Sequence, residues 1–416
     1  MEYYLQKKKI IKNREMRNFT FKGLFLAGLF MVLGCLSIQA ADDDGLITKQ
    51  ITIKLEKAGT LPDKIGSTKK FQITNLKIIG EINGTDLRMI REMAGKDAWG
   101  SKTDGMLSVL DLSDAKIVEG GDYYYTDYPY YSTYYSTSND KIGDYTFYGC
   151  SVLTSLTLPS GLTEIGEGAF AACSGLTSLT LPSGVTSIGN HAFYACSGLT
   201  SITLPSGVTS IGNHAFDGCT GLTSLTLPSG VTEIGDLAFY ACSGLTSITL
   251  PSGVTEIGSS AFDGCTGLTS ITLPSGVTEI GEFAFSACSG LTSITLPSGV
   301  TEIGEFAFER CSGLTSIYVY TEKLPKMGRS VFEDCDAKKC TVYVPKGTYD
   351  DYWLSEFGYF ENIVEFDATG IDKVTTSTDA KELSRYSVNG QRLSAPTKGL
   401  NIVKYSDGSV KKVVVQ

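Results

Sequence analysis

The chain has 416 residues and a net charge of −10, with 35 Lys and Arg against 45 Asp and Glu. An acidic chain without a basic block is a poor candidate for a nucleic-acid-binding protein, which needs clustered Lys and Arg. Because the chain contains only two His, a His-dependent active site or a His-rich metal cage is not expected.

The first 40 residues have the pattern of a secretory signal peptide. Basic residues up to Lys22 precede an uncharged run from Gly23 to Ala41, and small residues end it. Its apolar centre, Leu24 to Leu36, is shorter than the ~20 residues of a membrane-spanning helix. We therefore predict cleavage after Ala40 and export of the mature chain.

A second interpretation of the same segment is a lipoprotein signal. Val32-Leu33-Gly34-Cys35 resembles a bacterial lipobox, although Leu33 is bulky for that pattern. Lipidation of Cys35 would make the protein an outer-membrane lipoprotein. Both alternatives place the mature chain outside the cytoplasm, at the cell surface or secreted.

A 23-residue period dominates the chain. Eight cysteines recur at this spacing: Cys150, Cys173, Cys196, Cys219, Cys242, Cys265, Cys288 and Cys311. A fixed period of this length indicates a solenoid, in which each unit packs only on its neighbours.

One unit, Ser174 to Cys196, reads SGLTSLTLPSGVTSIGNHAFYAC. We expect a first strand with Leu176, Leu179 and Leu181 inward, and a turn at Pro182-Ser183-Gly184. A short second strand should carry Val185 and Ile188, and Ala192, Phe193 and Cys196 have the spacing of one helical turn. A lone coil buries too little apolar surface to offset about 1.5 kcal/mol of ordering entropy per residue, so coils must stack. Stacking predicts ladders of identical Phe, Ile and Cys side chains.

The pattern LxxLxLPxxVxxIGxxAFxxC, which covers about residues 142 to 345, resembles the leucine-rich repeats of BspA-like bacterial surface proteins. The resemblance implies a repeat solenoid with a parallel β-sheet on the concave face and short second strands and helical turns on the convex side. It also implies an exported surface protein, since several members of that family are implicated in adhesion to host proteins or other bacteria.

The remaining segments suggest caps and a tail. In the N-terminal cap we expect a strand at 76–82, Asp86 as an N-cap, and a helix at 87–94. The predicted organisation is a signal peptide at 1–40, an N-terminal cap at 46–105, a solenoid at 106–345 with a Tyr-rich insertion at 120–140, a C-terminal cap at 346–366, a linker at 367–381 and a β tail at 382–416.

The C-terminal tail has alternating or apolar strands with hairpin turns at Asn389-Gly390 and Asp407-Gly408. It resembles the sorting modules that direct Bacteroidota proteins through type IX secretion. Lys398-Gly399, Asn401-Ile402-Val403 and the run Lys411 to Val415 carry the resemblance. The simpler interpretation is a small terminal β-hairpin that adds stability.

Three sets of side chains contain groups that form disulfides or metal sites in other proteins, and each set has a simpler structural explanation. Stacked cysteines lie too far apart for disulfides, so buried free thiols are expected. For Cys335 and Cys340 the sequence allows either a disulfide or two free thiols. His191 and His214 stack, but zinc needs three or four ligands. A column of glutamates recurs in the second segment of four coils and is expected to form a solvated acidic stripe. This Glu column consists of Glu233, Glu256, Glu279 and Glu302. We predict no enzyme, no cofactor and no metal.

The first candidate binding surface is the outward side of the first strands. Seven coils repeat the same Thr, Ser and Thr there, which suits a repetitive ligand such as a polysaccharide bound by avidity. The simpler interpretation is recent duplication, with Thr favoured in strands. The candidate residues are Thr177, Ser178, Thr180, Thr200, Ser201, Thr203, Thr223, Ser224, Thr226, Thr246, Ser247 and Thr249.

The second candidate surface is the insertion, which carries information that the repeats lack. Tyr combines large contact area with low entropy cost, which suits recognition loops. A packed or flexible loop is the alternative. Its eight candidate residues are Tyr123, Tyr124, Tyr125, Tyr128, Tyr130, Tyr131, Tyr134 and Tyr135.

Together these features predict an exported cell-surface protein that mediates adhesion or binding to host proteins, other cells or glycans. The alternative is a passive scaffold without a specific ligand. No nucleic-acid partner is expected, and membrane association is expected only through a lipid or surface anchor.

Overall fold

The structure, a computed structural model, describes residues 45–127, 129–367, 382–387, 392–396, 398–405 and 410–415. The predicted signal peptide with Ala40 and Cys35 lies outside the described residues. So do Tyr128, linker residues 368–381, and the turns Asn389-Gly390 and Asp407-Gly408.

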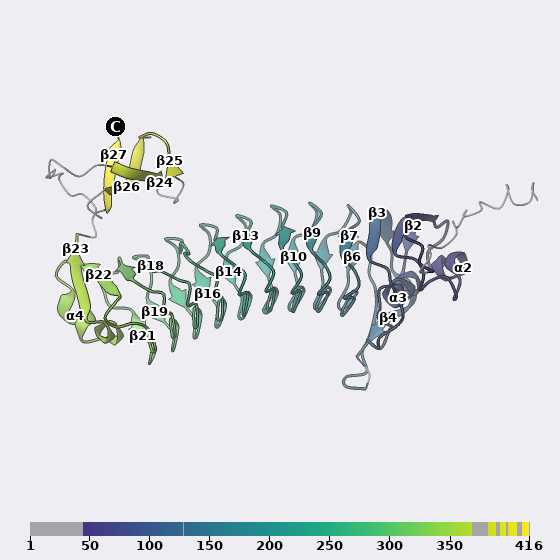
Figure 1. Ribbon diagram of the computed structural model, residues 1–416, viewed down its shortest axis with the longest axis horizontal. Helices are drawn as coiled ribbons and strands as arrows, with labels where there is room; N and C mark the ends of the chain where they lie inside the picture. Colours follow the sequence, from purple (N-terminus) through teal and green to yellow (C-terminus); the bar gives the residue numbers. More distant parts are fainter. Residues whose placement is uncertain are drawn as a thin grey trace, which may run out of the picture.

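The described chain is a row of stacked coils (Figure 1). First strands of successive coils pair in parallel, and Ile202 lies opposite Leu179 one coil away. They form three consecutive sheets. The first contains β1 (Ile51–Lys54), β2 (Asn75–Ile82), β3 (Val109–Ile117), β7 (Ser155–Thr157), β9 (Ser178–Thr180) and β11 (Ser201–Thr203); the second β13 (Ser224–Thr226) and β15 (Ser247–Thr249); the third β18 (Ser293–Leu296), β20 (Ser316–Val319), β22 (Thr341–Pro345) and β23 (Asn362–Phe366).

The short second strands also pair in parallel, in two further sheets. In the seven full repeats, the turn between the first and the second strand closes as expected; the Val185 N–H, for example, donates to the Pro182 carbonyl at 3.1 Å. The predicted leucine-rich-repeat solenoid is therefore confirmed. The second strands are β6 (Lys141–Ile142), β8 (Glu164–Ile165), β10 (Ser187–Ile188) and β12 (Ser210–Ile211) in one sheet, and β14 (Glu233–Ile234), β16 (Glu256–Ile257), β17 (Glu279–Ile280), β19 (Glu302–Ile303) and β21 (Lys326–Met327) in the other.

The core is a set of ladders along the row. Phe216 and Phe239 stack with ring centroids 5.4 Å apart, and the next pair repeats this at 5.3 Å. The phenylalanine ladder runs from Phe147 to Phe332. All inward side chains predicted for the coil ending at Cys196 are buried, so the inward half of the repeat pattern is confirmed.

The segment expected to form one helical turn is instead a series of tight turns. The Cys196 N–H donates to the Phe193 carbonyl three residues back, whereas the Phe193 N–H donates to Ala215 of the next coil. His191 and Ala195 both adopt positive φ, at 54°. Because alternate N–H groups bond to the neighbouring coil, they cannot form the i to i−4 bonds of a helix.

The residue before each ladder cysteine adopts positive φ, and it is Ala or Gly in every coil except the last, where it is Arg310. Ala241 has φ 52° and Gly264 has φ 73°. Holding an L-residue in the left-handed conformation costs about 1–2 kcal/mol. Glycine avoids this cost, but ordering its more flexible backbone costs about 0.5–1 kcal/mol more than ordering that of alanine. Ala241→Gly is therefore expected to raise the free energy of unfolding by about 0.5–1 kcal/mol, measured by denaturant titration.

The matched control for Ala241→Gly is Gly264→Ala, which should lower the free energy of unfolding by a similar amount. A Cβ built at Gly264 meets its nearest atom, the Ala241 Cα, at 3.4 Å, an ordinary contact. The effect is thus conformational and not steric. Equal stability of all three proteins would contradict this account.

The N-terminal end of the row is covered by β1, β2, α2 (Leu61–Ile65) and α3 (Gly84–Met93). The expected helix is present, but Asp86 is not its N-cap. Asn83 caps α3 by accepting from the Thr85 N–H at 3.1 Å, and Asp86 is the third helical residue, which binds back to the Asn83 N–H at 3.0 Å. The two residues form a capping box, so the helix begins earlier than expected.

The C-terminal end is covered by α4 (Tyr349–Trp353), η1 (Glu356–Tyr359) and β23. Phe332, the last ring of the ladder, packs against Phe357 and Phe360 at centroid distances of 5.1 and 5.0 Å. All three rings are buried. Aromatic side chains therefore close the open end of the core.

Two small antiparallel units complete the described chain. A hairpin of β4 (Gly120–Thr126) and β5 (Tyr134–Thr137) projects from the N-terminal end of the row (Figure 1). The tail forms its own four-stranded sheet of β24 (Glu382–Ser387), β25 (Arg392–Leu393), β26 (Gly399–Tyr405) and β27 (Val410–Val415). Within the described ranges, no helix is long and apolar enough to cross a membrane.

Candidate functional site

The outward residues of the first strands lie exposed in regular columns. Ser178 and Thr180 are exposed and pair in register with Ser201 and Thr203 of the next coil. The same exposure holds for the other candidate residues in the three following rows. The outward Thr and Ser side chains therefore form exposed columns that are in register from coil to coil.

The first threonine of most rows has a structural role that the sequence did not reveal. The Thr200 hydroxyl donates to the Thr177 carbonyl at 3.0 Å, and the Thr246 hydroxyl donates to Thr223 at 3.0 Å. These bonds supplement the backbone ladder between coils. Invariance of this column thus follows from coil-to-coil bonding, without any need for a ligand.

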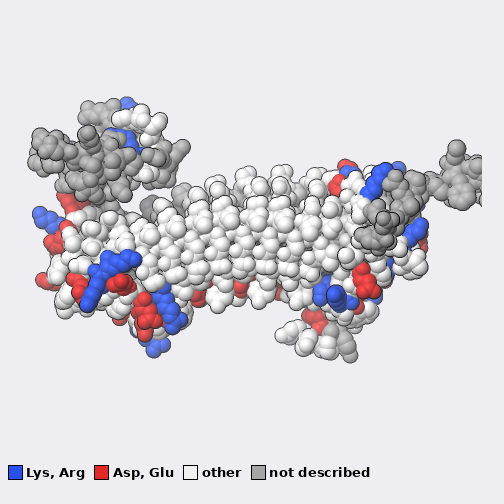
Figure 2. Space-filling model, in the orientation of Figure 1, with Lys and Arg blue, Asp and Glu red and all other residues white. Residues whose placement is uncertain are grey.

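The face of the row seen in Figure 2 is almost uncharged in its middle. Lys, Arg, Asp and Glu gather over the two ends, and red acidic atoms appear along the lower edge. On this face, charged residues are therefore concentrated at the two ends of the row.

The Tyr-rich insertion divides into a packed base and an exposed tip. Tyr124 is 1% exposed, and its hydroxyl donates to the Asp144 carbonyl at 2.9 Å. Burial raises the pKa of Tyr124 to about 12. Tyr125 packs against Tyr135, Tyr145 and Tyr148. The base of the hairpin is therefore part of the core that covers the first coil.

The tip carries the exposed members of the set. Tyr130, Tyr131 and Tyr134 are 85%, 84% and 59% exposed. Tyr123 is half-buried and meets Tyr134 edge to face at 4.9 Å. The insertion thus contributes buried and packed side chains to the fold through Tyr124 and Tyr125. Replacing all its tyrosines would disturb the fold, and only the tip is free for recognition.

The ladder cysteines are buried free thiols, as expected. From Cys173 to Cys311, each thiol donates to a phenylalanine carbonyl of the preceding coil, for example Cys242 to Phe216 at 3.1 Å. Burial raises the pKa of Cys196 and Cys242 to about 12. Cys335 and Cys340 are also free. These thiols are held protonated and serve packing.

The stacked histidines and the acidic column have local partners. The rings of His191 and His214 lie 4.5 Å apart, and His214 Nδ1 lies 2.8 Å from Asp217 Oδ2. Burial first, and the neighbouring His214 second, lower the pKa of His191. In the described part of the chain, no group of three His, Cys, Asp or Glu is placed to hold a metal.

The Glu column is in register from Glu233 to Glu302. Burial, followed by the charges of Glu279 and Glu233, raises the pKa of Glu256. Lys326 ends the column with an ion pair to Glu302 at 2.6 Å. The stripe is largely solvated, and a lysine relieves the repulsion at its end.

Two arginines on α3 were missed by the sequence analysis. Arg91 is fully buried against the first coil, whereas Arg88 is half-buried beside the exposed Trp99. Their three-residue spacing in the expected helix places both on one side. That spacing was the available signal, but their partners come from distant segments and could not be inferred.

Comparison with known proteins identifies the repeats. The model of the BspA type leucine rich repeat region matches residues 121–246 and 232–351, in six copies. A search of curated proteins found no match. The chain therefore resembles this family over more than half of its length.

Several solved structures are similar. A leucine-rich repeat protein of T. pallidum is 37% identical, with 36% of this chain and 72% of that chain covered and a TM-score of 0.34. One from Bacteroides ovatus is 22% identical, with coverage of 78% and 97% and a TM-score of 0.35. A leucine-rich cell-surface protein of Faecalibacterium prausnitzii is 24% identical, with coverage of 56% and 84% and a TM-score of 0.27. On the match of the repeat model, the chain belongs to the BspA-type leucine-rich-repeat family.

Proposed function

We propose that this protein is displayed on the surface of a bacterial cell and binds a macromolecular partner through the tip of its Tyr-rich hairpin. The partner is a host protein, a protein of another cell or a glycan. The proposal assigns no reaction to the chain. Membership of a leucine-rich-repeat surface family supports a binding role.

The observation that carries the proposal is the contrast between the hairpin tip and the repeats. Tyr130 and Tyr131 are the most exposed aromatic residues described, at 85% and 84%. Large, rigid and amphipathic side chains of this kind supply contact area at low entropy cost. The outward Thr and Ser columns are the same in seven coils and so hold no information about one particular protein.

Export rests on the sequence of the two ends. Residues 1–40 have the signal pattern, and the tail from 382 to 416 resembles a sorting module. Cys35 offers the alternative route of lipid anchoring. Each route leads to the same proposal of surface display.

A second candidate function is binding of a repetitive glycan by the exposed Ser and Thr columns. The in-register rows at Ser178 and Ser201 support it, because identical weak sites in a row bind repeating ligands by avidity. A passive scaffold would bind nothing through either surface.

Substitution of the two most exposed tip tyrosines tests the leading proposal. The purified mature protein is screened against immobilised glycans, host matrix proteins and bacterial surface proteins. Tyr130→Ser combined with Tyr131→Ser should weaken binding to the best ligand at least about tenfold, since interface tyrosines are frequent hot spots. Because both side chains point to solvent, the melting temperature should not change.

The matched control for the tip variant is Tyr194→Ser combined with Tyr240→Ser. These repeat tyrosines are 42% and 37% exposed, and their loss should leave binding intact. A control that weakens binding as much as the tip variant would move the site to the repeats. A screen without any ligand would support the passive scaffold.

A further inference from the structure

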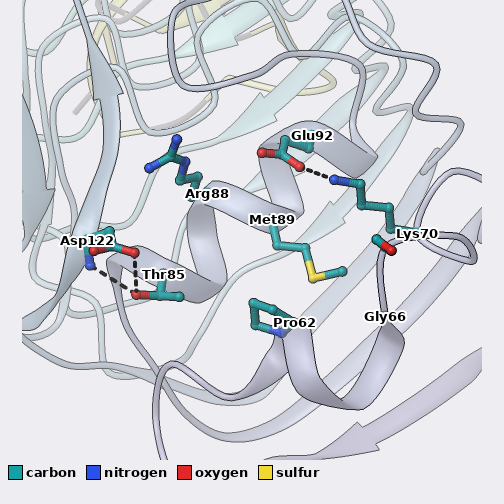
Figure 3. A pocket seen from close by; sticks show the side chains of 9 residues that line it. Pro62, Gly66, Lys70, Thr85, Arg88, Met89, Glu92 and Asp122 are labelled. Carbon is teal, nitrogen blue, oxygen red and sulfur yellow. Dashed lines mark hydrogen bonds and ion pairs between the residues drawn. The ribbon is translucent and has the colours of Figure 1, made fainter.

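A pocket of about 360 Å³ lies in the N-terminal cap, between α2, α3 and β4 (Figure 3). Its volume lies within the range of small-ligand sites, about 300–1,000 Å³. Met89 and Pro62 contribute an apolar wall, and Arg88 lines the side that faces β4. The pocket is separate from the hairpin tip and can hold one or two sugar-sized rings.

The other polar groups around the pocket are already paired. Lys70 forms an ion pair with Glu92. The Asp122 N–H donates to Thr85 Oγ1 at 3.0 Å, and the Thr85 hydroxyl donates back to the Asp122 carboxylate at 3.4 Å. Figure 3 shows these two pairs on opposite sides of the pocket. They form fixed walls and leave Arg88 as the cation available for a ligand.

Arg88 is positioned by aromatic rings and not by acceptors. Its Cζ lies 5.3 Å from the ring centroid of Trp99 and 5.0 Å from that of Tyr123. Among the described residues, no oxygen accepts a hydrogen bond from its guanidinium. The five N–H donors of this group lie in one plane and match a carboxylate in bidentate geometry. A ligand carboxylate would therefore find a positioned and unoccupied partner.

The rings beside Arg88 remain open to solvent. Trp99 is 51% exposed, and Tyr134, which packs on Tyr123, is 59% exposed. The face of an aromatic ring carries negative charge density and attracts the weakly positive C–H groups on one face of a sugar ring. A free inorganic anion gains nothing from these rings, and a neutral sugar gains little from Arg88.

We propose that this pocket binds a carboxylated sugar, a hexuronic or sialic acid unit of a glycan. The carboxylate pairs with the Arg88 guanidinium, and the sugar ring stacks on Trp99, which contacts Arg88 at the edge of the pocket and is not part of the pocket lining. This site goes beyond the function proposed for the hairpin tip, because it recognises a small acidic group and uses different residues.

Titration of the full mature chain tests the proposal. Methyl β-D-glucuronide and methyl α-sialoside are compared with methyl β-D-glucoside and acetate by calorimetry. At least one acidic sugar should bind with a Kd of about 1 mM. Its affinity should be at least about tenfold higher than that of the neutral glucoside or of acetate, since each of these controls lacks one of the two interactions. Equal binding of the neutral glucoside, equal binding of acetate, or no binding of either acidic sugar would overturn the proposal.

Variants locate the site. Trp353 and Trp99 are the only two tryptophans, so Trp353→Phe leaves Trp99 as the sole indole reporter and should not alter affinity. Trp99→Ala and Arg88→Lys, which keeps the charge but loses the planar donors, should each weaken binding at least about tenfold. Arg88→Gln provides a second test if the lysine variant melts differently from the wild type.

The hairpin variant separates the two proposals. Tyr130→Ser with Tyr131→Ser should leave sugar affinity unchanged while weakening macromolecular binding. Wild-type sugar affinity in both Arg88 variants would show that the guanidinium does not bind the ligand and would contradict the inference.

Discussion

Phe239→Ala is expected to lower the free energy of unfolding by about 3–5 kcal/mol, as truncation of fully buried phenylalanines does. Phe239 is 0% exposed and stacks on Phe216 and Phe262 at 5.4 and 5.3 Å. Its removal opens a cavity between two coils and breaks two ring contacts. In a solenoid, loss of one interface is felt directly by both neighbours. Denaturant titration of the purified mature chain measures the change.

The matched control for Phe239→Ala is Thr249→Ala on the outward side of β15. Thr249 is exposed, and such surface changes usually alter the free energy of unfolding by under ~0.5 kcal/mol. Two variants that unfold alike would show that the inward and outward faces are wrongly assigned.

Arg91→Met is expected to destabilise the N-terminal end by about 3–5 kcal/mol, because several backbone carbonyls lose a buried charged donor. The Arg91 guanidinium donates to the carbonyls of Tyr145 and Thr146 at 2.9 and 2.8 Å. It also donates to the backbone carbonyls of Asp97 and Tyr148 at 3.2 and 3.4 Å. Methionine fills similar space but leaves these carbonyls without that donor. Hydrogen exchange should show loss of protection in α3 and in the first coil.

Arg88→Met, on the same helix, is the control for Arg91→Met. Arg88 is half-buried and holds only ring contacts, worth about 0.5–1 kcal/mol at such sites. Protection of α3 should therefore survive. If both arginine variants lose protection equally, the cap is not attached through Arg91.

The repeat period made the core predictable, because stacking requires each coil to place the same residue in the same position. Leu179 and Phe193 were therefore assigned inward correctly, as their burial shows. The turn before each cysteine was predicted as helical from spacing alone. Spacing does not reveal that alternate N–H groups bond to the next coil, as Phe193 does to Ala215.

The ends of the molecule were less predictable, since their contacts join distant segments. The Arg91 bonds span 54 and 55 residues to Tyr145 and Thr146. Eight similar tyrosines gave no sign that Tyr124 is buried while Tyr130 is exposed. Strand alternation within a hairpin separates such residues only when its register is known.

Deletion of whole coils, compared with substitution of the tip tyrosines, tests most directly whether binding resides in the hairpin. Variants lacking residues 197–219 or 197–242 keep the repeat register and both ends. With the best ligand of the screen, their affinities should stay within about twofold of wild type, because each coil contacts only its neighbours. Tyr130→Ser with Tyr131→Ser should weaken the same interaction at least about tenfold. Stepwise weakening with each deleted coil, together with a tip variant that binds normally, would contradict the account and assign binding to the repeated Ser and Thr face.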